Sequence, residues 1–339
     1  MSRVWEWAKF LAKRLAQLLV VLIGISIVVF IVTHAIGNPV YLIVGQTATS
    51  EVIQERIHKF GLDRPLWEQY ILYIQNLLKG DWGISRYTYN PVLVDIQNRL
   101  PATLELSIFA LLLSLLWSIP LGVIAAFKKG GLIDSFIQFL SRLANSVPGF
   151  WLGLVLIFAF FAKLHLLPAP LGRIDSNIAM PPRITGLIVI DSLLAGNTPA
   201  LISSLRHLIL PAVTLAVTVS PSILLLTRNT MEKVLESNFI RAARAFGLSS
   251  LTIVRYSLKN ILGPVLTMVA MTLGYLIGGT VLIEVVFAWP GIGFYAVDAM
   301  NHSDYEPILA VVLLCALVYN LAYLISDVIA AMIDPRVRL

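Results

Sequence analysis

Long apolar runs separated by polar segments dominate the hydrophobicity pattern of this chain. A helix of about 20 apolar residues crosses the hydrocarbon core of a bilayer, and each run has about that length or more. We therefore predict an all-α polytopic membrane protein with six transmembrane helices. The predicted spans are residues 15–33, 103–127, 133–162, 208–227, 261–287 and 307–331.

Proline and glycine residues predict where these spans begin, bend or break. Pro101 suits the first turn of the second span, and Pro120 predicts a kink inside it. The third span is expected to be interrupted near Pro148 and Gly149. In the fourth span, Pro211 is expected in the first turn and Pro221 is expected to break the second half.

The polar segments predict three regions outside the spans. Segment 35–102 has aromatic and apolar residues at helical spacing, such as Trp67, Tyr70 and Ile74, which indicates an extracytoplasmic segment of short helices. Segment 163–207 is rich in turn residues and is expected to be a loop with an interfacial helix over 188–195. Segment 228–260 is expected to be a cytoplasmic loop, with Ser249 and Ser250 capping an amphipathic helix that runs towards Pro264. The predicted divisions are the N-terminus with the first helix (1–34), the extracytoplasmic segment (35–102) and a five-helix core (103–339).

Positive charge predicts the orientation of the chain. A signal peptide also starts basic and continues apolar, but its apolar part is 7–15 residues long, so the 19-residue run 15–33 favours a retained first helix. With both termini inside, inner segments hold 14 Lys and Arg in 61 residues, against 10 in 135 outer residues. Because inner loops carry the excess of positive charge, both termini and the loop 228–260 are expected to be cytoplasmic.

Composition excludes several functional classes. The chain is 58% hydrophobic and 13% charged, whereas soluble domains are about 25% charged. The net charge of +6 is spread over short loops, which argues against a nucleic-acid partner. The dipeptide Gly-Lys does not occur, so no phosphate-binding loop of the Gly-x-x-x-x-Gly-Lys type is present. One cysteine, Cys315, and five scattered histidines provide no metal-ligand spacing. We predict no enzyme active site, no cofactor and no metal on this chain.

A short basic stretch in loop 228–260 is the strongest candidate functional element. Ala242, Ala243 and Ala245 favour a helix over about 239–246, and Gly247 can supply the left-handed residue that ends it. A helix this short is unstable alone, so it is expected to dock into a partner through its small alanine face. Phe239, Ile240 and Phe246 are the expected apolar anchors. An ordinary loop helix is the alternative.

The pair Ala242-Ala243 followed by Gly247 resembles the EAA loop of ABC importer permeases. Two positions differ from the usual motif, because Arg241 replaces the general Glu and Phe246 replaces a frequent Lys. In that family the loop is the coupling helix, which sits in a cleft of a separate ATPase subunit. The resemblance therefore implies coupling roles for Phe239, Ile240, Arg241, Ala242, Ala243, Arg244, Ala245, Phe246 and Gly247.

Further motifs extend the resemblance over nearly the whole chain, to the permeases of the dipeptide, oligopeptide and nickel branch. The matching residues are 61–65, 69–70, 80–85, 91–92, 99–106, 289–293 and 334–338, while 36–39 and Tyr256 depart from the pattern. The resemblance implies an ATP-driven importer of dipeptides or oligopeptides in a bacterial or archaeal cytoplasmic membrane. Its implied partners are a second homologous permease, two ATP-binding subunits that hold ATP and Mg, an extracytoplasmic solute-binding protein and a peptide substrate. Nickel, glutathione and oligosaccharides are alternative cargoes within the family.

The fifth span contains a candidate translocation path. Thr267, Met271, Gly274 and Gly278 fall on one helical face, and Met adapts to varied side chains. Tight packing of this face against another helix is the alternative. Glu105 is expected to cap a helix rather than to touch substrate. A stand-alone secondary transporter or channel is the alternative of another class, and it predicts internal repeats or charges at mid-membrane depth.

Overall fold

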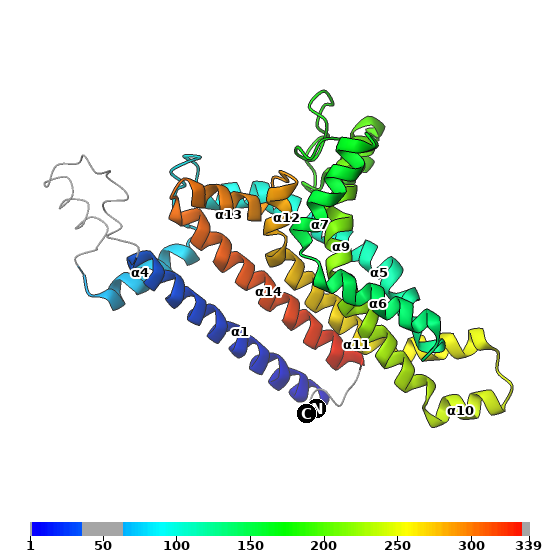
Figure 1. Ribbon diagram of the computed structural model, residues 1–339. Helices are drawn as coiled ribbons and strands as arrows, with labels where there is room; N and C mark the ends of the chain where they lie inside the picture. The colour runs from blue at the N-terminus through cyan, green and yellow to red at the C-terminus, as the bar shows by residue number, and fades with distance from the viewer. Residues whose placement is uncertain (1, 36–63, 334–339) are drawn as a thin grey trace, which may run out of the picture. The chain divides into compact units, whose positions relative to one another are not determined.

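The computed structural model describes residues 2–35 and 64–333, and all regular elements in these two ranges are helices (Figure 1). The motif positions 36–39, 61–63 and 334–338 lie outside the described residues. The helices are α1 (Ser2–Ala35), α4 (Leu66–Leu78), α5 (Val92–Phe127), α6 (Leu132–Ser146), α7 (Gly149–Leu156), the π-helix η1 (Ile157–Lys163), α8 (Ile188–Leu194), α9 (Thr198–Leu235), α10 (Asn238–Ala245), α11 (Ser250–Gly279), α12 (Val281–Val286), α13 (Ile292–Asn301) and α14 (Tyr305–Ile333).

Five helices in the described ranges are long and apolar enough to cross a membrane, namely α1, α5, α9, α11 and α14. The α6 helix and the α7–η1 segment pass the same test together, but they are bent by 98° where the chain passes Val147 and Pro148. The interruption expected near Pro148 is therefore confirmed, and the span count is five, or six if the bent pair is one span.

Three helices are longer than the sequence pattern predicts. The α5 helix begins at Val92, so Pro101 lies inside it and not in its first turn. The α9 helix runs unbroken through both Pro211 and Pro221, and α11 joins the expected amphipathic helix to the fifth span. Membrane helices tolerate proline where hydroxyl groups satisfy the freed carbonyls. Pro221 removes the N–H that would bond the carbonyl of Val217, and hydroxyl groups reinforce the helix on either side: Ser220 Oγ donates to the carbonyl of Ala216, and Ser118 Oγ donates to the carbonyl of Ser220.

The described residues form two compact units. Unit 1 comprises 2–10, 99–294 and 318–333, and unit 2 comprises 11–35, 64–98 and 295–317. The core of unit 1 is built where α5, α9 and α11 meet, and α6 and α7 also pack against α9. Its fully buried side chains include Leu106, Leu208, Ile223 and Leu276.

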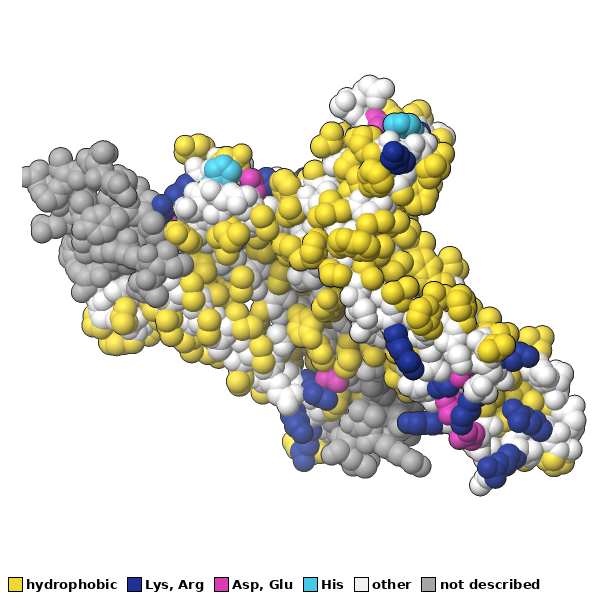
Figure 2. Space-filling view, in the orientation of Figure 1, with side chains coloured by type: hydrophobic (Ala, Val, Ile, Leu, Met, Phe, Trp, Pro, Cys, Tyr) yellow, Lys and Arg dark blue, Asp and Glu magenta, His cyan; other side chains and the backbone are white. Residues whose placement is uncertain are grey.

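Polar side chains cap two of the long helices, and the cap at Ser249 is the one that the sequence predicts. The side chain of Ser249 accepts the backbone N–H of Thr252 at the start of α11, and Asn197 accepts that of Ala200 at the start of α9. A helix expected over 188–195 is confirmed as α8, over Ile188–Leu194. Charged side chains gather over the part of unit 1 that carries α10 and the end of α9, whereas most of the remaining visible surface is apolar (Figure 2).

Candidate functional site

The α10 helix lies between the ends of α9 and α11 in unit 1. It ends in a Schellman motif, in which the N–H of Leu248 donates to the carbonyl of Ala243 (3.1 Å) and the N–H of Gly247 donates to that of Arg244 (3.0 Å). Gly247 has a φ of +75°. The prediction that Gly247 ends a short helix in the left-handed conformation is therefore confirmed.

One side chain attaches α10 to the rest of unit 1. Ile240 is 0% exposed, and it packs in a cluster with Met231 and Leu235 of α9, Ile253 of α11 and Ala126 of α5. Sequence reasoning treated Ile240 as an anchor for a partner, but its side chain is buried inside this chain. Ile240 therefore fixes α10 in place.

The remaining face of α10 is available to a partner. Phe246 is 86% exposed, and Phe239 and Leu251 are also exposed large apolar side chains. Arg241, Ala242, Arg244, Ala245 and Gly247 are exposed, and Ala243 is half-buried. An apolar and basic surface with small residues at its centre suits docking against another protein, since buried interface centres favour aromatic and Arg side chains.

A polar cavity of about 310 Å³ lies in unit 1 between α6, α9, α11 and α14. It is lined by Asn145, Thr218, Val219, Ser222, Met268, Met271, Thr272, Tyr275, Tyr319 and Tyr323. None of these ten side chains is charged. The hydroxyl of Tyr319 donates to that of Tyr323 at 3.0 Å. Amide, hydroxyl and thioether groups can accommodate a polar solute of variable shape without holding it by a fixed charge.

The four residues predicted to line a path occupy different surroundings. Met271 lines the polar cavity. Gly274 faces α14, because a Cβ atom there would meet the Cβ of Ala322 at 2.9 Å. The carbonyl of Thr267 accepts a hydrogen bond from Ser326 Oγ (3.3 Å), and Gly278 has no neighbour within 4 Å of a built Cβ.

Sequence reasoning found only Met271 among the lining residues: six others come from helices other than α11, and Met268, Thr272 and Tyr275 lie on α11 but outside the predicted set. Thr218 and Ser222 lie on α9, Asn145 lies in the last turn of α6, and Tyr319 and Tyr323 lie on α14. The available signal was the presence of amide and hydroxyl side chains inside otherwise apolar runs. It could not by itself show that these runs meet.

We expect Gly274→Ala to lower the thermal stability of the protein, because the added methyl must displace Ala322 or Tyr319. Overpacking a tight contact costs about 1–3 kcal/mol. Gly278→Ala is the matched control on the same helix, since its methyl enters open space and alanine favours a helix. Thermal denaturation in detergent measures both variants, and an equal midpoint for the two would contradict the packing role of Gly274.

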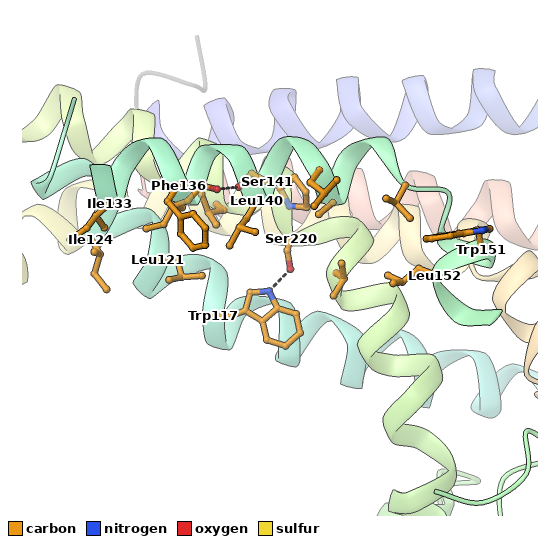
Figure 3. A pocket seen from close by; sticks show the side chains of 17 residues that line it. Trp117, Leu121, Ile124, Ile133, Phe136, Leu140, Ser141, Trp151, Leu152 and Ser220 are labelled. Carbon is orange, nitrogen blue, oxygen red and sulfur yellow. Dashed lines mark hydrogen bonds between the residues drawn. The ribbon is translucent and has the colours of Figure 1, made fainter. Parts of the chain in front are cut away.

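A second cavity in unit 1 is larger and apolar, with a volume of about 630 Å³ (Figure 3). It lies between α5, α6, α7 and α9, and Trp117, Phe136, Leu140 and Trp151 are among its lining residues. Its polar groups already have partners, because Trp117 Nε1 donates to Ser220 Oγ and Ser141 Oγ donates to the carbonyl of Ile137. These walls offer a polar solute nothing to bind, so the polar cavity is the better candidate path.

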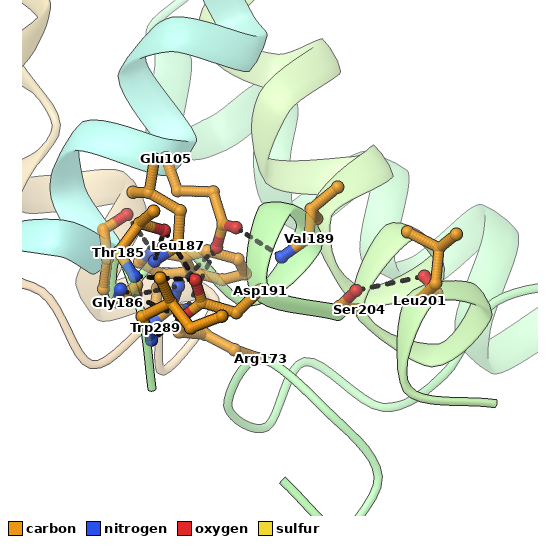
Figure 4. A network of polar contacts seen from close by, with 12 residues as sticks. Glu105, Arg173, Thr185, Gly186, Leu187, Val189, Asp191, Leu201, Ser204 and Trp289 are labelled. Carbon is orange, nitrogen blue, oxygen red and sulfur yellow. Dashed lines mark hydrogen bonds and ion pairs between the residues drawn. The ribbon is translucent and has the colours of Figure 1, made fainter. Parts of the chain in front are cut away.

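A buried carboxylate connects α5 to the segment before α9 (Figure 4). Glu105 is 2% exposed, forms an ion pair with Arg173 and accepts the backbone N–H of Val189 at 2.8 Å. Val189 is in the first turn of α8, so Glu105 caps α8. Sequence reasoning placed this residue at the start of its own helix, which in fact begins at Val92. The Arg173 guanidinium lies 5.7 Å from the ring of Trp289, whose Nε1 donates to the carbonyl of Ala102.

Asp191 orders the turn before α8 in the same region. Its carboxylate accepts backbone N–H groups of Ile184, Thr185 and Gly186 and the hydroxyl of Thr185. Burial raises the pKa of the Asp191 carboxyl, but these hydrogen bonds outweigh burial and hold the pKa below its ordinary value. The charged groups of this region therefore have structural partners within the chain.

Removing the charge of Glu105 is expected to destabilise the protein strongly. Glu105→Gln leaves the largely buried guanidinium of Arg173 without its ion pair, which costs about 3–5 kcal/mol at a buried site. Glu236→Gln is the control, because Glu236 pairs with Lys129 at the surface, where an ion pair contributes about 1 kcal/mol or less. A thermal midpoint of the Glu105 variant equal to that of the Glu236 variant would show that the buried pair does not stabilise the fold.

The turn 289–293 is built around a third buried carboxylate, Glu284. Its oxygens accept the hydroxyl of Thr103 (2.6 Å), the hydroxyl of Thr280 (3.0 Å) and the N–H of Phe294 (2.9 Å). Thr103 Oγ1 in turn accepts the N–H of Ile292. Gly291 and Gly293 let the backbone approach this network closely.

Within the described ranges, no group of three His, Cys, Asp or Glu side chains is placed to hold a metal ion. The geometry therefore offers a protein-docking helix and a polar cavity as the candidate functional sites.

Comparison with known proteins assigns the family. Residues 118–339 match the family model of binding-protein-dependent transport system inner membrane components, and residues 7–107 match the model of the N-terminal part of such components. A probable D,D-dipeptide transport system permease, DdpB of Escherichia coli K12, is 37% identical over 96% of each chain. The dipeptide transport system permease DppB of Haemophilus influenzae is 39% identical over 97% of this chain and 99% of its own.

The fold also has a solved counterpart. A chain of the MetNI methionine ABC transporter, determined in inward-facing conformations, aligns with a TM-score of 0.53 and 15% identity, over 72% of this chain and 98% of its own. At this identity the match supports the fold alone. Together, the matched family models and the extent of the similarity to dipeptide permeases show that the chain belongs to the binding-protein-dependent transport system inner membrane components, the multi-pass permease subunits of ABC importers.

Proposed function

We propose that this chain is the permease subunit of an ATP-driven importer for dipeptides or short oligopeptides, and that α10 couples it to a separate ATPase. The observation that carries the coupling proposal is the surface of α10. Ile240 fixes the helix to unit 1, while Phe246, both arginines and the alanines other than Ala243 remain exposed. A helix held on one side and exposed on the other can transmit a displacement from a partner. Similarity to dipeptide permeases supports the peptide cargo.

The proposed coupling residues are those of α10 and its C-terminal turn. Phe239 and Phe246 supply apolar contacts with the ATPase, and Arg241 and Arg244 supply charge. Ala242, Ala243 and Ala245 permit close approach, and Gly247 ends the helix with Phe246 exposed. ATP and Mg belong to two ATP-binding subunits, since this sequence has no Gly-Lys dipeptide for a phosphate-binding loop. The excess of Lys and Arg in the predicted inner segments supports a cytoplasmic position for α10 and both termini.

The polar cavity is the proposed contribution of this chain to the translocation path. A volume of about 310 Å³ is near the lower end for small-molecule sites, which span about 300–1,000 Å³. A second, homologous permease would complete the path from its own side. Main-chain amides of a peptide can pair with Asn145, Thr272 and the tyrosine hydroxyls, while Met268 and Met271 adapt to its side chains.

Transport then follows from two states of the bundle. A solute-binding protein delivers the peptide to the outer face, and closure of the ATPase pair on ATP draws the coupling helices together. The ATPase pair can shift the equilibrium between these two states only if it binds one of them more tightly than the other.

Purification of the tagged chain from its native membrane in mild detergent tests the proposal. A second permease and an ATPase should co-elute with the chain. A single chain that elutes alone and moves peptide in liposomes without ATP would contradict the proposal and indicate a stand-alone transporter.

A further inference from the structure

A cluster of ion pairs joins the start of α6 to the last turns of α9 in unit 1. At its buried end, the Arg228 guanidinium donates to both carboxylate oxygens of Asp134, from Nε at 2.8 Å and from Nη2 at 2.7 Å. The side chains of Arg228 and Asp134 are 13% and 3% exposed. Two parallel hydrogen bonds from a planar guanidinium fix both the distance and the relative orientation of the two helices.

The cluster continues along α9 to the surface. Arg228 Nη1 also donates to Glu232, and Lys129, in the turn between α5 and α6, contacts both Glu232 and Glu236 at 2.6 Å. Asp134 additionally accepts the N–H of Gly130 and the amide of Gln138. We call these five charged residues, Lys129, Asp134, Arg228, Glu232 and Glu236, the Arg228 cluster.

The Arg228 cluster lies between the two candidate functional sites. The cluster extends to Glu236, the residue directly after α9, two positions before α10 begins at Asn238. On the other side, Asp134 is in the first turn of α6, and Asn145 near the end of α6 lines the polar cavity. Asp134 and Asn145 are 11 residues apart, which corresponds to about 16 Å along a helix. One rigid helix therefore connects the cluster with the cavity wall.

Beyond these ion pairs, α6 packs along one face against α9 and exposes its other face. Ile137 packs with Ala125 and Leu224, but Phe136, Phe139, Leu140 and Leu143 are exposed in this chain. The apolar cavity lies along the same helix (Figure 3). At its end, the chain turns by 98° into the α7–η1 segment. A helix that is held to α9 at its first turn and along one face, and that ends in a sharp bend, can follow a displacement of α9 as a unit.

We propose that the Arg228–Asp134 pair makes α6 the connecting element that carries a displacement of α10 and the end of α9 to Asn145 in the wall of the polar cavity. Arg228 and Asp134 are positioning residues in this proposal, which rests on the proposed function. A buried ion pair is a poor source of stability compared with apolar side chains of similar volume, and fixing a unique arrangement is one use of such a pair. Lysine cannot replace the guanidinium in this role, because it lacks the planar fork.

Peptide uptake per ATP hydrolysed tests this proposal. It is measured on the chain reconstituted with its co-purified permease and ATPase. We expect Arg228→Gln and Asp134→Asn each to lower peptide uptake per ATP hydrolysed about tenfold, while basal ATPase activity persists. Arg228→Lys should also reduce this ratio, because it keeps the charge but loses the bidentate contact. The double variant Asp134→Asn/Arg228→Gln should lose no more than the worse single variant, since interacting residues are not additive. Lys129→Gln, at the exposed end of the cluster, is the control with a ratio close to that of the unmodified protein.

Further measurements distinguish a loss of coupling from a loss of folded or assembled protein. Each variant complex is first checked for its amount in the membrane and for retained ATPase. Spin labels at Ser146→Cys and Lys259→Cys, in a Cys315→Ala background, then report the distance between α6 and α11 with and without ATP. We expect ATP to shift this distance in the parent and not in Arg228→Gln. An ATP-dependent shift preserved in Arg228→Gln, or an unchanged uptake ratio, would overturn the role of the pair. Absence of any co-purifying ATPase in the parent would instead contradict the proposed function.

Discussion

Replacing Gly247 by valine is expected to abolish ATP-driven peptide uptake while the protein still accumulates in the membrane. Gly247 has a φ of +75°, a conformation that β-branched residues strongly disfavour, at a cost of about 1–3 kcal/mol. Relief of this strain would open the Schellman motif and move Phe246 away from its exposed position. No atom lies within 4 Å of a built Cβ, so a steric clash at the Cβ atom is not the cause. Uptake by membrane vesicles and co-purification of the ATPase measure the effect.

Gly172→Val is the matched control for this prediction. Gly172 also has a positive φ, of +72°, and no atom within 4 Å of a built Cβ, but it lies in the segment between η1 and α8. Similar backbone strain is thus introduced away from α10. We expect this variant to retain most of its uptake. Equal uptake in the two variants would contradict a coupling role for the C-terminal turn of α10.

Replacing Gly291 by alanine is expected to reduce the amount of folded protein several-fold. The added methyl would collide with Glu284 Oε2 and Thr103 Oγ1, which form the buried network beneath the turn 289–293. Moving either group leaves a buried polar atom without its hydrogen bond, and this cost of about 1–3 kcal/mol adds to that of overpacking. Gly293→Ala should behave similarly, because its methyl would lie 2.7 Å from the Cα of Val281.

The amount of protein in the membrane and the thermal midpoint in detergent measure this effect. Gly24→Ala is the control, since no atom lies within 4 Å of a Cβ built at Gly24 on α1. We expect this variant to accumulate normally. Normal accumulation of both Gly291→Ala and Gly293→Ala would show that the close approach at this turn is unnecessary for folding.

Local patterns predicted much of the fold. The apolar runs identified the long helices, and turn residues identified the interruption near Pro148, the α8 helix and the end of α10 at Gly247. These features depend on hydrophobicity and backbone preferences that are readable within about ten residues. The lengths of α5, α9 and α11 were underestimated, because proline is a poor helix residue in water but is accommodated where neighbouring groups satisfy the backbone.

Features that need residues far apart in the chain could not be predicted. The burial of Ile240 depends on α5, α9 and α11 meeting beside α10. The partner of Glu105 is Arg173, 68 positions away, and the polar cavity draws on four helices. A single sequence shows that these residue types are present, but not that they lie together. The coupling stretch was accessible because its signal is local, and it remains a proposal for this chain.

The most direct test of the central claim is peptide uptake by proteoliposomes that contain the chain with its co-purified permease and ATPase. A dipeptide-loaded solute-binding protein is supplied outside, and ATP with Mg is enclosed. We expect dipeptide accumulation that requires ATP, the binding protein and an intact Gly247. Equal uptake without ATP or without the ATPase subunits would contradict the assignment of this chain as a permease driven through α10.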